Sequence, residues 1–143
     1  MFHILHQDGV ENISDAQVED QIRILNRDYQ KQNADTAIVV EPFKSLIAKV
    51  GMGFKLARKD PNGNCTNGIV RHVTPKKNWD ANNLNAFEFS WPRNKYLNIY
   101  VVKTINIAAT AYAFLPGTPV PASADAIVTL HNMVGSIGTG TVA

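Results

Sequence analysis

Apolar positions along the chain fall into short strand-like runs and one long helical stripe. Residues 2–6, "FHILH", have the length and apolar content of a β-strand. Further on, four apolar residues recur at the i, i+4, i+7 and i+11 spacing of one helix face: Val18, Ile22, Leu25 and Tyr29. Ser14 and Gln17 match the S-x-x-Q capping box that opens many helices. The pattern predicts an amphipathic helix over residues 14–32, packed on a flat surface.

The remaining apolar runs predict a short helix and more strands. Pro42 and Gly51 bracket apolar residues at helical spacing, which predicts a helix over residues 42–50. Five runs predict strands: 53–59, 69–74, 95–103, 109–117 and 126–130. The run 95–103 is β-branched or aromatic on both faces, so we expect it at the centre of a sheet. A strand, then helices, then strands indicates a parallel or mixed sheet with helices on a face.

Composition fits one globular domain and excludes several classes of function. The chain has 143 residues, of which 45% are hydrophobic and 18% charged, with a formal net charge of +2. Its lysines and arginines are scattered, which argues against a dedicated nucleic-acid surface. The sequence has no apolar run near the roughly 18 residues that a membrane-spanning helix needs. Cys65, the single cysteine, lies in a polar turn and is interpreted as an incidental exposed thiol.

The histidines do not show the spacing of a metal site. His3 and His6 are three apart on a predicted strand, so their side chains should point to opposite faces of the sheet. His72 and His131 are isolated in the sequence, and there is no C-x-x-C pair or histidine pair at i, i+4. We therefore interpret all four as structural or surface residues. Asp60 in "DPNG" could bind calcium, but a plain turn is the favoured interpretation.

The segment "GSIGTG", Gly135 to Gly140, follows the last predicted strand. Its spacing is G-x-x-G-x-G, which differs from the dinucleotide fingerprint G-x-G-x-x-G, and it does not follow the first strand. A flexible connector is therefore favoured. A nucleotide-binding α/β domain that uses Gly135–Gly140 remains a minor alternative.

Five motifs, in order, resemble the pappalysin-type metzincins, the zinc metalloprotease family of ulilysin and cytophagalysin-like enzymes. The first is "ENISDAQVEDQIRILNRDYQKQNAD", and the second is "GFKLARKDPNGNCTNGIVRH". They are followed by "WPRNKYLNIYVV", "AYAFLPG" and "DAIVTLHNMVGSIGTG". Each motif alone is weak, but the ordered set covers nearly the whole chain.

The resemblance implies that residues 1–143 form the N-terminal subdomain of such a catalytic domain. We expect a zincin-like α/β (α+β) fold, with a twisted five-stranded mixed sheet, an antiparallel edge strand and one long helix on a face. In the family, the glycine-rich connector leads into an H-E-x-x-H helix that binds the catalytic zinc, and this motif is absent from the sequence. We therefore expect a truncated, inactive piece without catalytic residues or zinc. The complete enzyme would be a secreted or cell-surface zinc endopeptidase.

The resemblance also implies one site within this chain. In metzincins, the substrate backbone pairs with the antiparallel edge strand, which corresponds here to Ala111, Tyr112, Ala113, Phe114 and Leu115. The alternative is a non-catalytic module of the same fold that captures extended peptides. Because the family's active-site helix is absent, we also expect an uncovered apolar face on strands 96–102 and 126–130, through which the chain would self-associate.

Overall fold

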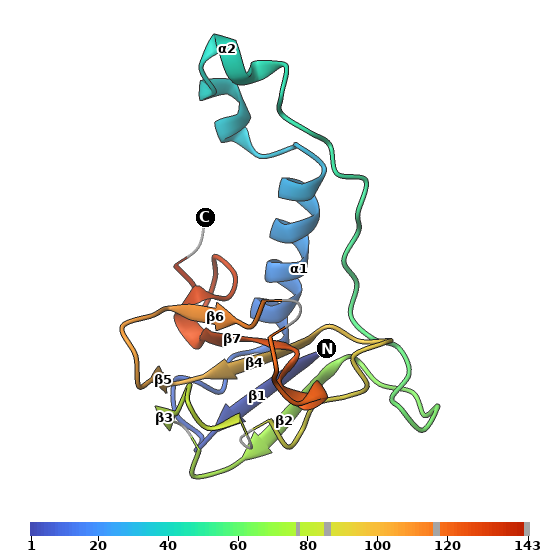
Figure 1. The fold of residues 1–143 in the computed structure, drawn as a ribbon, viewed down its shortest axis with the longest axis vertical. Helices are drawn as coiled ribbons and strands as arrows, with labels where there is room; N and C mark the ends of the chain where they lie inside the picture. The colour runs from blue at the N-terminus through green and yellow to red at the C-terminus, as the bar shows by residue number, and fades with distance from the viewer. Residues whose placement is uncertain (77, 85–86, 116–117, 142–143) are drawn as a thin grey trace.

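The centre of the molecule is a five-stranded mixed sheet (Figure 1). The computed structural model describes residues 1–76, 78–84, 87–115 and 118–141. The strands lie in the order β2 (Ile69–Val73), β1 (Phe2–His6), β4 (Asn98–Val102), β7 (Ala126–Leu130) and β6 (Ala111–Ala113). All neighbours are parallel except β6, which is antiparallel to β7. The predicted mixed sheet with an antiparallel edge strand is confirmed, and so is its central strand.

An aromatic layer covers one face of the sheet. Trp79 and Phe87 pack there against Tyr100 of β4, with ring centroids about 5 Å apart. Trp79 is brought to this layer by a second, two-stranded parallel sheet of β3 (Asn78–Trp79) and β5 (Thr104–Ile105), which the sequence did not predict. Two short 3₁₀ turns lie next to β7 in the sequence: η3 (Ala122–Ala124) precedes it and η4 (His131–Met133) follows it.

Helix α1 (Asp15–Tyr29) packs on the other face through its N-terminal half and then leads away from the sheet. Ile13 and Val18, just before and within the helix, are buried with Phe2, Ile4 and Val101 of the sheet. All five residues of β4 and of β1 are buried. The expectation of an uncovered apolar face is therefore wrong: the chain's own loops and α1 fill both sides of β4, and β7 is buried or half-buried throughout. Self-association stays a prediction, but this face cannot be its basis.

The helix begins as predicted and ends three residues early. Ser14 is the N-cap, and its Oγ accepts the N–H of Gln17 at 3.2 Å. At the other end, the N–H of Gln32 donates to the Arg27 carbonyl, and the N–H of Lys31 donates to the Asp28 carbonyl. This is the Schellman arrangement, with Lys31 in the left-handed conformation (φ 59°) that glycine usually takes. Because the closing residue is a lysine, the sequence did not reveal where the helix ends.

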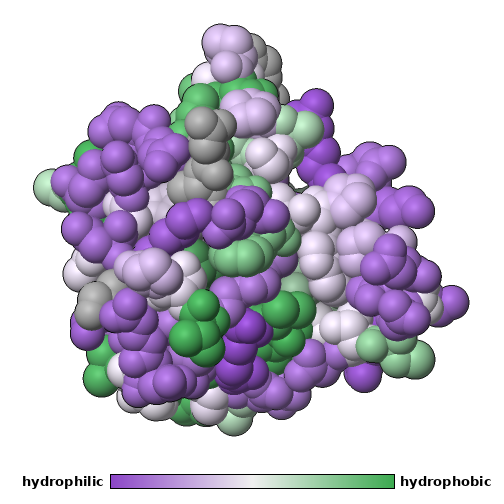
Figure 2. Space-filling view, turned by 90° about the horizontal axis from the view of Figure 1, so that it is seen from below, coloured by the Kyte–Doolittle hydropathy of each residue, from purple (hydrophilic) through white to green (hydrophobic). Residues whose placement is uncertain are grey.

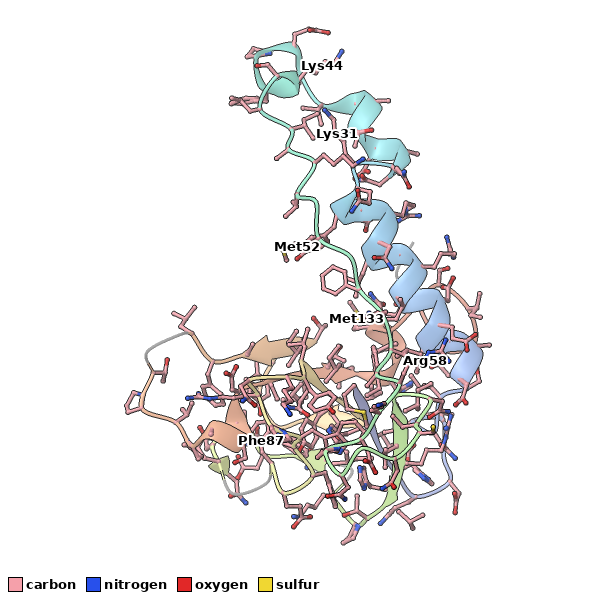
Figure 3. All side chains as sticks on the ribbon, turned by 90° about the vertical axis from the view of Figure 1, so that its right-hand side faces the viewer. Lys31, Lys44, Met52, Arg58, Phe87 and Met133 are labelled. Carbon is pink, nitrogen blue, oxygen red and sulfur yellow. The ribbon has the colours of Figure 1, made fainter. Side chains whose placement is uncertain are left out.

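Beyond α1 the chain forms an arm, residues 30–58, that projects away from the sheet (Figures 1 and 3). It contains η1 (Ala34–Ile38) and the four-residue helix α2 (Glu41–Lys44). The predicted helix over 42–50 is wrong beyond Lys44. Its apolar residues remain exposed, Leu46 by 71% and Val50 by 52%, so no burial stabilises a further turn.

The predicted strand over residues 53–59 is also absent as a strand. Both edges of β1 are already paired, with β2 and with β4, so the sheet offers this segment no partner beside β1. Instead, the Asn26 side chain of α1 donates to the Phe54 carbonyl at 2.8 Å and accepts the Phe54 N–H at 2.7 Å. One isolated bridge, Lys59 to Cys65, closes the turn that follows. Asp60 accepts bonds from Asn62 and Asn64 within this turn, in agreement with the favoured interpretation.

Candidate functional site

Among the described strands, β6 lies at the end of the sheet and has only β7 beside it. Its register pairs Ala111 with Thr129, Tyr112 with Val128 and Ala113 with Ile127. Of the five residues expected to bind substrate, Ala111, Tyr112 and Ala113 form this strand, while Phe114 and Leu115 continue the chain beyond it. Pro116 and Gly117, expected to end the strand, lie outside the described residues.

The backbone of β6 presents hydrogen-bonding groups to its open side. The N–H of Leu130 donates to the Thr110 carbonyl at 2.9 Å, so residues 110 and 130 form a hydrogen-bonded pair. Such pairs alternate along an antiparallel ladder, so Tyr112 bonds to β7, while the N–H and C=O groups of Ala111 and Ala113 point outward. An extended peptide could add there as a further strand.

The side chains of β6 divide between the two faces. Tyr112 and Phe114 lie on the aromatic side, where the Trp79 indole N–H donates to the Tyr112 hydroxyl at 2.6 Å. Burial raises the pKa of the Tyr112 phenol, so it stays neutral at physiological pH. Ala111 and Ala113 lie on the α1 side and are exposed. The strand is therefore anchored on one face by an aromatic cluster, and on the other its exposed side chains are only methyl groups.

The glycine-rich connector is fixed to α1. Gln17, only 1% exposed, donates through Nε2 to the Val134 carbonyl at 2.8 Å and to the His131 carbonyl at 3.1 Å. One turn further along the helix, Gln21 accepts the N–H of Gly135 at 2.7 Å. The expectation of a flexible connector is thus wrong, because side chains of α1 bond it along its length. The sequence shows polar helix residues at these positions but gives no sign of their partners.

Asp20 occupies the place that an anion would take in this loop. Its Oδ2 accepts both the N–H and the hydroxyl of Ser136, at 2.7 and 2.8 Å. The Ser136 N–H, followed by Arg23, holds the pKa of Asp20 at about 2. Thr139 N–H is likewise bonded, to Gln17 Oε1. Since a carboxylate of the chain already fills the loop, the arrangement argues against the nucleotide-binding alternative.

Among the described residues, the four histidines do not gather in one cluster, but His3 and His72 meet. His3 lies in the aromatic layer, stacked on Tyr100, with Nε2 3.1 Å from the Asn98 side-chain oxygen. Its Nδ1 is 3.2 Å from Nε2 of His72, and burial lowers the pKa of His3 to about 4. His6 bonds instead to the turn at Asp8, and His131 to Thr139. His3 and His72 thus meet as neighbours across β1 and β2, a pairing that isolated sequence positions did not predict.

These side chains do not fit a catalytic zinc centre. Among residues 1–76, 78–84, 87–115 and 118–141, no three histidine, cysteine, aspartate or glutamate side chains gather closely enough to hold a metal ion. His3 and His72 are a pair without a third such ligand, and each is packed against an aromatic ring. No helix within the described ranges combines the length and the apolar character required to cross a membrane.

Comparisons with known proteins agree with this architecture. No family model and no curated protein matches the chain. Several chains of solved structures match, and three of them do so at a TM-score of 0.85 and 34% identity over 97% of this chain. They are mature mirolysin of Tannerella forsythia in complex with a cleaved peptide, a mutant of promirolysin from the same organism, and mirolysin in complex with compound 9.

The chain spans about half the length of these relatives, 54%, 47% and 53% of each respectively. The likeness covers the whole sheet and α1, because it includes nearly all of this chain. In sequence and in fold, the chain belongs to the pappalysin-type metzincins, the metalloprotease family of mirolysin, and has the fold of their N-terminal subdomain.

Proposed function

We propose that residues 1–143 are the N-terminal part of the catalytic domain of a metalloendopeptidase that hydrolyses peptide bonds. The observation that carries this proposal is the match to mirolysin, 34% identical over 97% of the chain with a TM-score of 0.85. Because the chain spans only about half of mirolysin, peptide hydrolysis is proposed for the complete protein.

Within this part, we assign β6 the task of holding substrate. The outward N–H and C=O groups of Ala111 and Ala113 would pair with the backbone of an extended peptide. A peptide held in this way is straight and has its bonds in a fixed register, which is what a hydrolytic centre needs to act on one peptide bond. The small side chains of Ala111 and Ala113 would leave room for those of the substrate.

The catalytic zinc would be held by residues outside this sequence. The described residues supply no ligand set for it, so we derive no chemical step through the metal. The 143-residue chain alone should therefore be inactive. A secreted or cell-surface location for the complete protein follows from the family and is part of the same proposal.

Two assays test the proposal. The complete product of the parent gene should cleave an unfolded protein such as casein, and o-phenanthroline should abolish the cleavage. The 143-residue chain, incubated with equimolar ZnCl2, should cleave nothing. A complete product that binds extended peptides but cleaves none would instead support the non-catalytic peptide-binding module. Chelator-sensitive cleavage by the short chain would contradict its proposed inactivity.

A further inference from the structure

The arm carries an unusual share of the molecule's exposed apolar side chains. Six residues between 38 and 52 are at least 49% exposed: Ile38, Val40, Phe43, Leu46, Val50 and Met52. No residue of η1 or of α2 is buried. Figure 3 shows the arm rising from the body, with Lys44 at its tip and Met52 on the returning segment. By contrast, the face of the body seen in Figure 2 is mainly polar, with apolar residues in small patches.

Although its side chains are uncovered, the backbone of the arm is held in place. The N–H of Val50 bonds to the Tyr29 carbonyl at 3.2 Å, which joins the returning segment to the end of α1. Lys31 Nζ reaches the Ile47 carbonyl at 3.2 Å, and Gln30 reaches that of Met52 at 2.8 Å. The two hydrogen bonds between the Asn26 side chain and the Phe54 backbone fix the base of the arm. A preformed apolar surface of this kind is typical of an interface.

The arm is also basic. It contains five basic residues, Lys31, Lys44, Lys49, Lys55 and Arg58, against two acidic ones, Asp35 and Glu41, which gives +3. The whole chain has +2, so the rest of it carries −1. Lys49 and Lys55 make no ion pair or side-chain hydrogen bond with any other described residue. A partner for this surface should therefore be apolar at its centre and acidic at its rim.

We infer that the arm is the docking surface for the remaining half of the same polypeptide, which packs on it in the complete protein. This inference rests on the proposed function. About half of each mirolysin chain lies outside the match, so a body of comparable size is available to cover the arm. Because the arm is basic, we expect the segments that cover it to be acidic.

The position of the connector supports the proposal that the remaining half of the polypeptide packs on the arm. Gln17 and Gln21 hold the connector beside the first half of α1, and the arm starts where α1 ends. In Figure 1 the segment after β7 lies next to this helix. From Gln21 to Tyr29 the helix rises about 12 Å, so the point where Gln21 holds the connector is about 12 Å along the helix axis from the start of the arm.

Hydrogen exchange of the short and the complete chain tests the inference. In the complete protein, the backbone amides of residues 38–52 should exchange at least about tenfold more slowly than in the 143-residue chain. Amides of the β1–β4 ladder, which are buried in both, serve as the internal reference. Equal exchange of residues 38–52 in both chains would overturn the inference.

Substitutions separate the interface from the stability of the arm itself. Phe43→Asp and Leu46→Asp should leave the Tm of the 143-residue chain unchanged, because both side chains are exposed there. In the complete protein each should lower the Tm by several degrees. Val10→Asp, also at an exposed apolar residue (58%) but in the turn after β1, is the matched control and should have no effect in either chain.

Other occupants give different results. A complete protein that dimerises in light scattering, and becomes monomeric with Leu46→Asp, would assign the arm to a second copy and overturn the inference. Co-sedimentation with phosphatidylserine vesicles that Leu46→Asp abolishes would assign it to a membrane, with the same consequence. Peptide hydrolysis is measured separately. If arm substitutions destabilise a complete protein that cleaves nothing, the docking surface stands and the proposed function fails.

Discussion

At the residue scale, Gln17 has a different role from the one its position suggests. Three residues after the N-cap Ser14, it occupies the place where a capping-box side chain turns back to the N-cap backbone. In the structure only the first half of that box exists, the bond from the Gln17 N–H to Ser14 Oγ. The side chain is buried and bonds the connector instead. Local patterns predict where a helix begins, but they do not reveal a partner more than 110 residues away.

Replacing Gln17 should loosen the connector from α1. Gln17→Met keeps the side-chain volume but leaves the buried Val134 carbonyl without its Gln17 donor, and the His131 carbonyl with only the hydroxyl of Thr139. We expect the free energy of unfolding to fall by about 3 kcal/mol. Gln30→Met, which removes a single exposed bond to Met52, should cost less than about 0.5 kcal/mol. Urea unfolding of the two variants measures both values, and equal losses would contradict this role for Gln17.

Asp20 predicts a pH dependence at the same contact. Its pKa is lowered from 3.8 to about 2 in the folded protein, chiefly by the Ser136 N–H. A carboxyl whose pKa is lower folded than unfolded stabilises the protein above its unfolded pKa, and this stabilisation is lost as the pH falls from about 4 to 2. Asp20→Asn should be less stable than the wild type at pH 6, with the difference shrinking toward pH 2. Thermal unfolding between pH 6 and pH 2 measures the difference in stability between the variant and the wild type. A difference that stays constant over this range would rule out the proposed pH dependence.

At the scale of elements, the connector depends on glycine for space as well as for conformation. Gly138 has φ 63°, and a Cβ added there would lie 2.5 Å from Gln17 Oε1. Gly51 in the arm has a similar φ of 73°, but nothing lies within 4 Å of its added Cβ. Gly51→Ala should cost the conformational strain alone, about 1 kcal/mol. Gly138→Ala should cost about 2–3 kcal/mol, since the docked Gln17 must also move. Chemical denaturation compares the unfolding free energies of the two variants. Similar losses would show that the contact between Gly138 and Gln17 is loose.

Strand β6 allows a test of substrate pairing that spares the sheet. The N–H of Ala113 points to the open side, so Ala113→Pro removes a donor from the proposed peptide ladder and none from the pairing with β7. In the complete protein, kcat/KM for peptide cleavage should fall about tenfold, as expected for one lost hydrogen bond. Ala113→Ser, which keeps the N–H, is the control. Equal activity of both variants would remove β6 from substrate binding.

Some strands of the sheet could be predicted from the sequence, and one predicted strand did not form. The runs at β1, β4 and β7 could be predicted because these strands are mostly apolar and largely buried. The run at β2 could be predicted from Ile69, Val70 and Val73, although this edge strand is partly exposed. The run 53–59 mixes apolar and basic residues and forms no strand. It cannot pair beside β1, which already has two partners from distant segments, and the Asn26 side chain bonds the Phe54 backbone instead. The site was placed by the family resemblance, whereas its anchoring by Trp79 comes from β3, a two-residue strand too short for any pattern.

For the whole molecule, the central strands β1 and β4 are covered on both faces without the active-site helix that the resemblance suggested would be needed. The segment between β2 and β4 supplies Trp79 and Phe87, which pack against Tyr100 and bury that face of β4. Six of the large apolar residues left exposed lie instead on the arm, between Ile38 and Met52. The sequence could not show this, because the arm and the segment between β2 and β4 both contain apolar residues, and which of them are buried depends on what packs against them.

The aromatic layer also links the stability of the whole domain to pH. His3 is fully buried between Tyr100 and His72, and burial lowers its pKa from 6.5 to about 4. A histidine whose pKa is lower folded than unfolded stabilises the protein above its unfolded pKa, and the stabilisation disappears as the pH falls through the folded value. His3 should therefore contribute up to about 3 kcal/mol at pH 7, lost between pH 6.5 and 4.

His3→Gln isolates this contribution. The amide side chain can still donate to Asn98 but does not titrate, so the variant's free energy of unfolding should change less between pH 7 and 4 than that of the wild type. NMR titration of the His3 ring should give a midpoint near 4 in the folded wild type. His131→Gln, at a half-buried histidine whose pKa burial also lowers, is the control and should have a smaller effect on this slope. A His3 ring that titrates near 6.5 would mean that water reaches the layer, and that β1 and β4 are less tightly covered than their burial indicates.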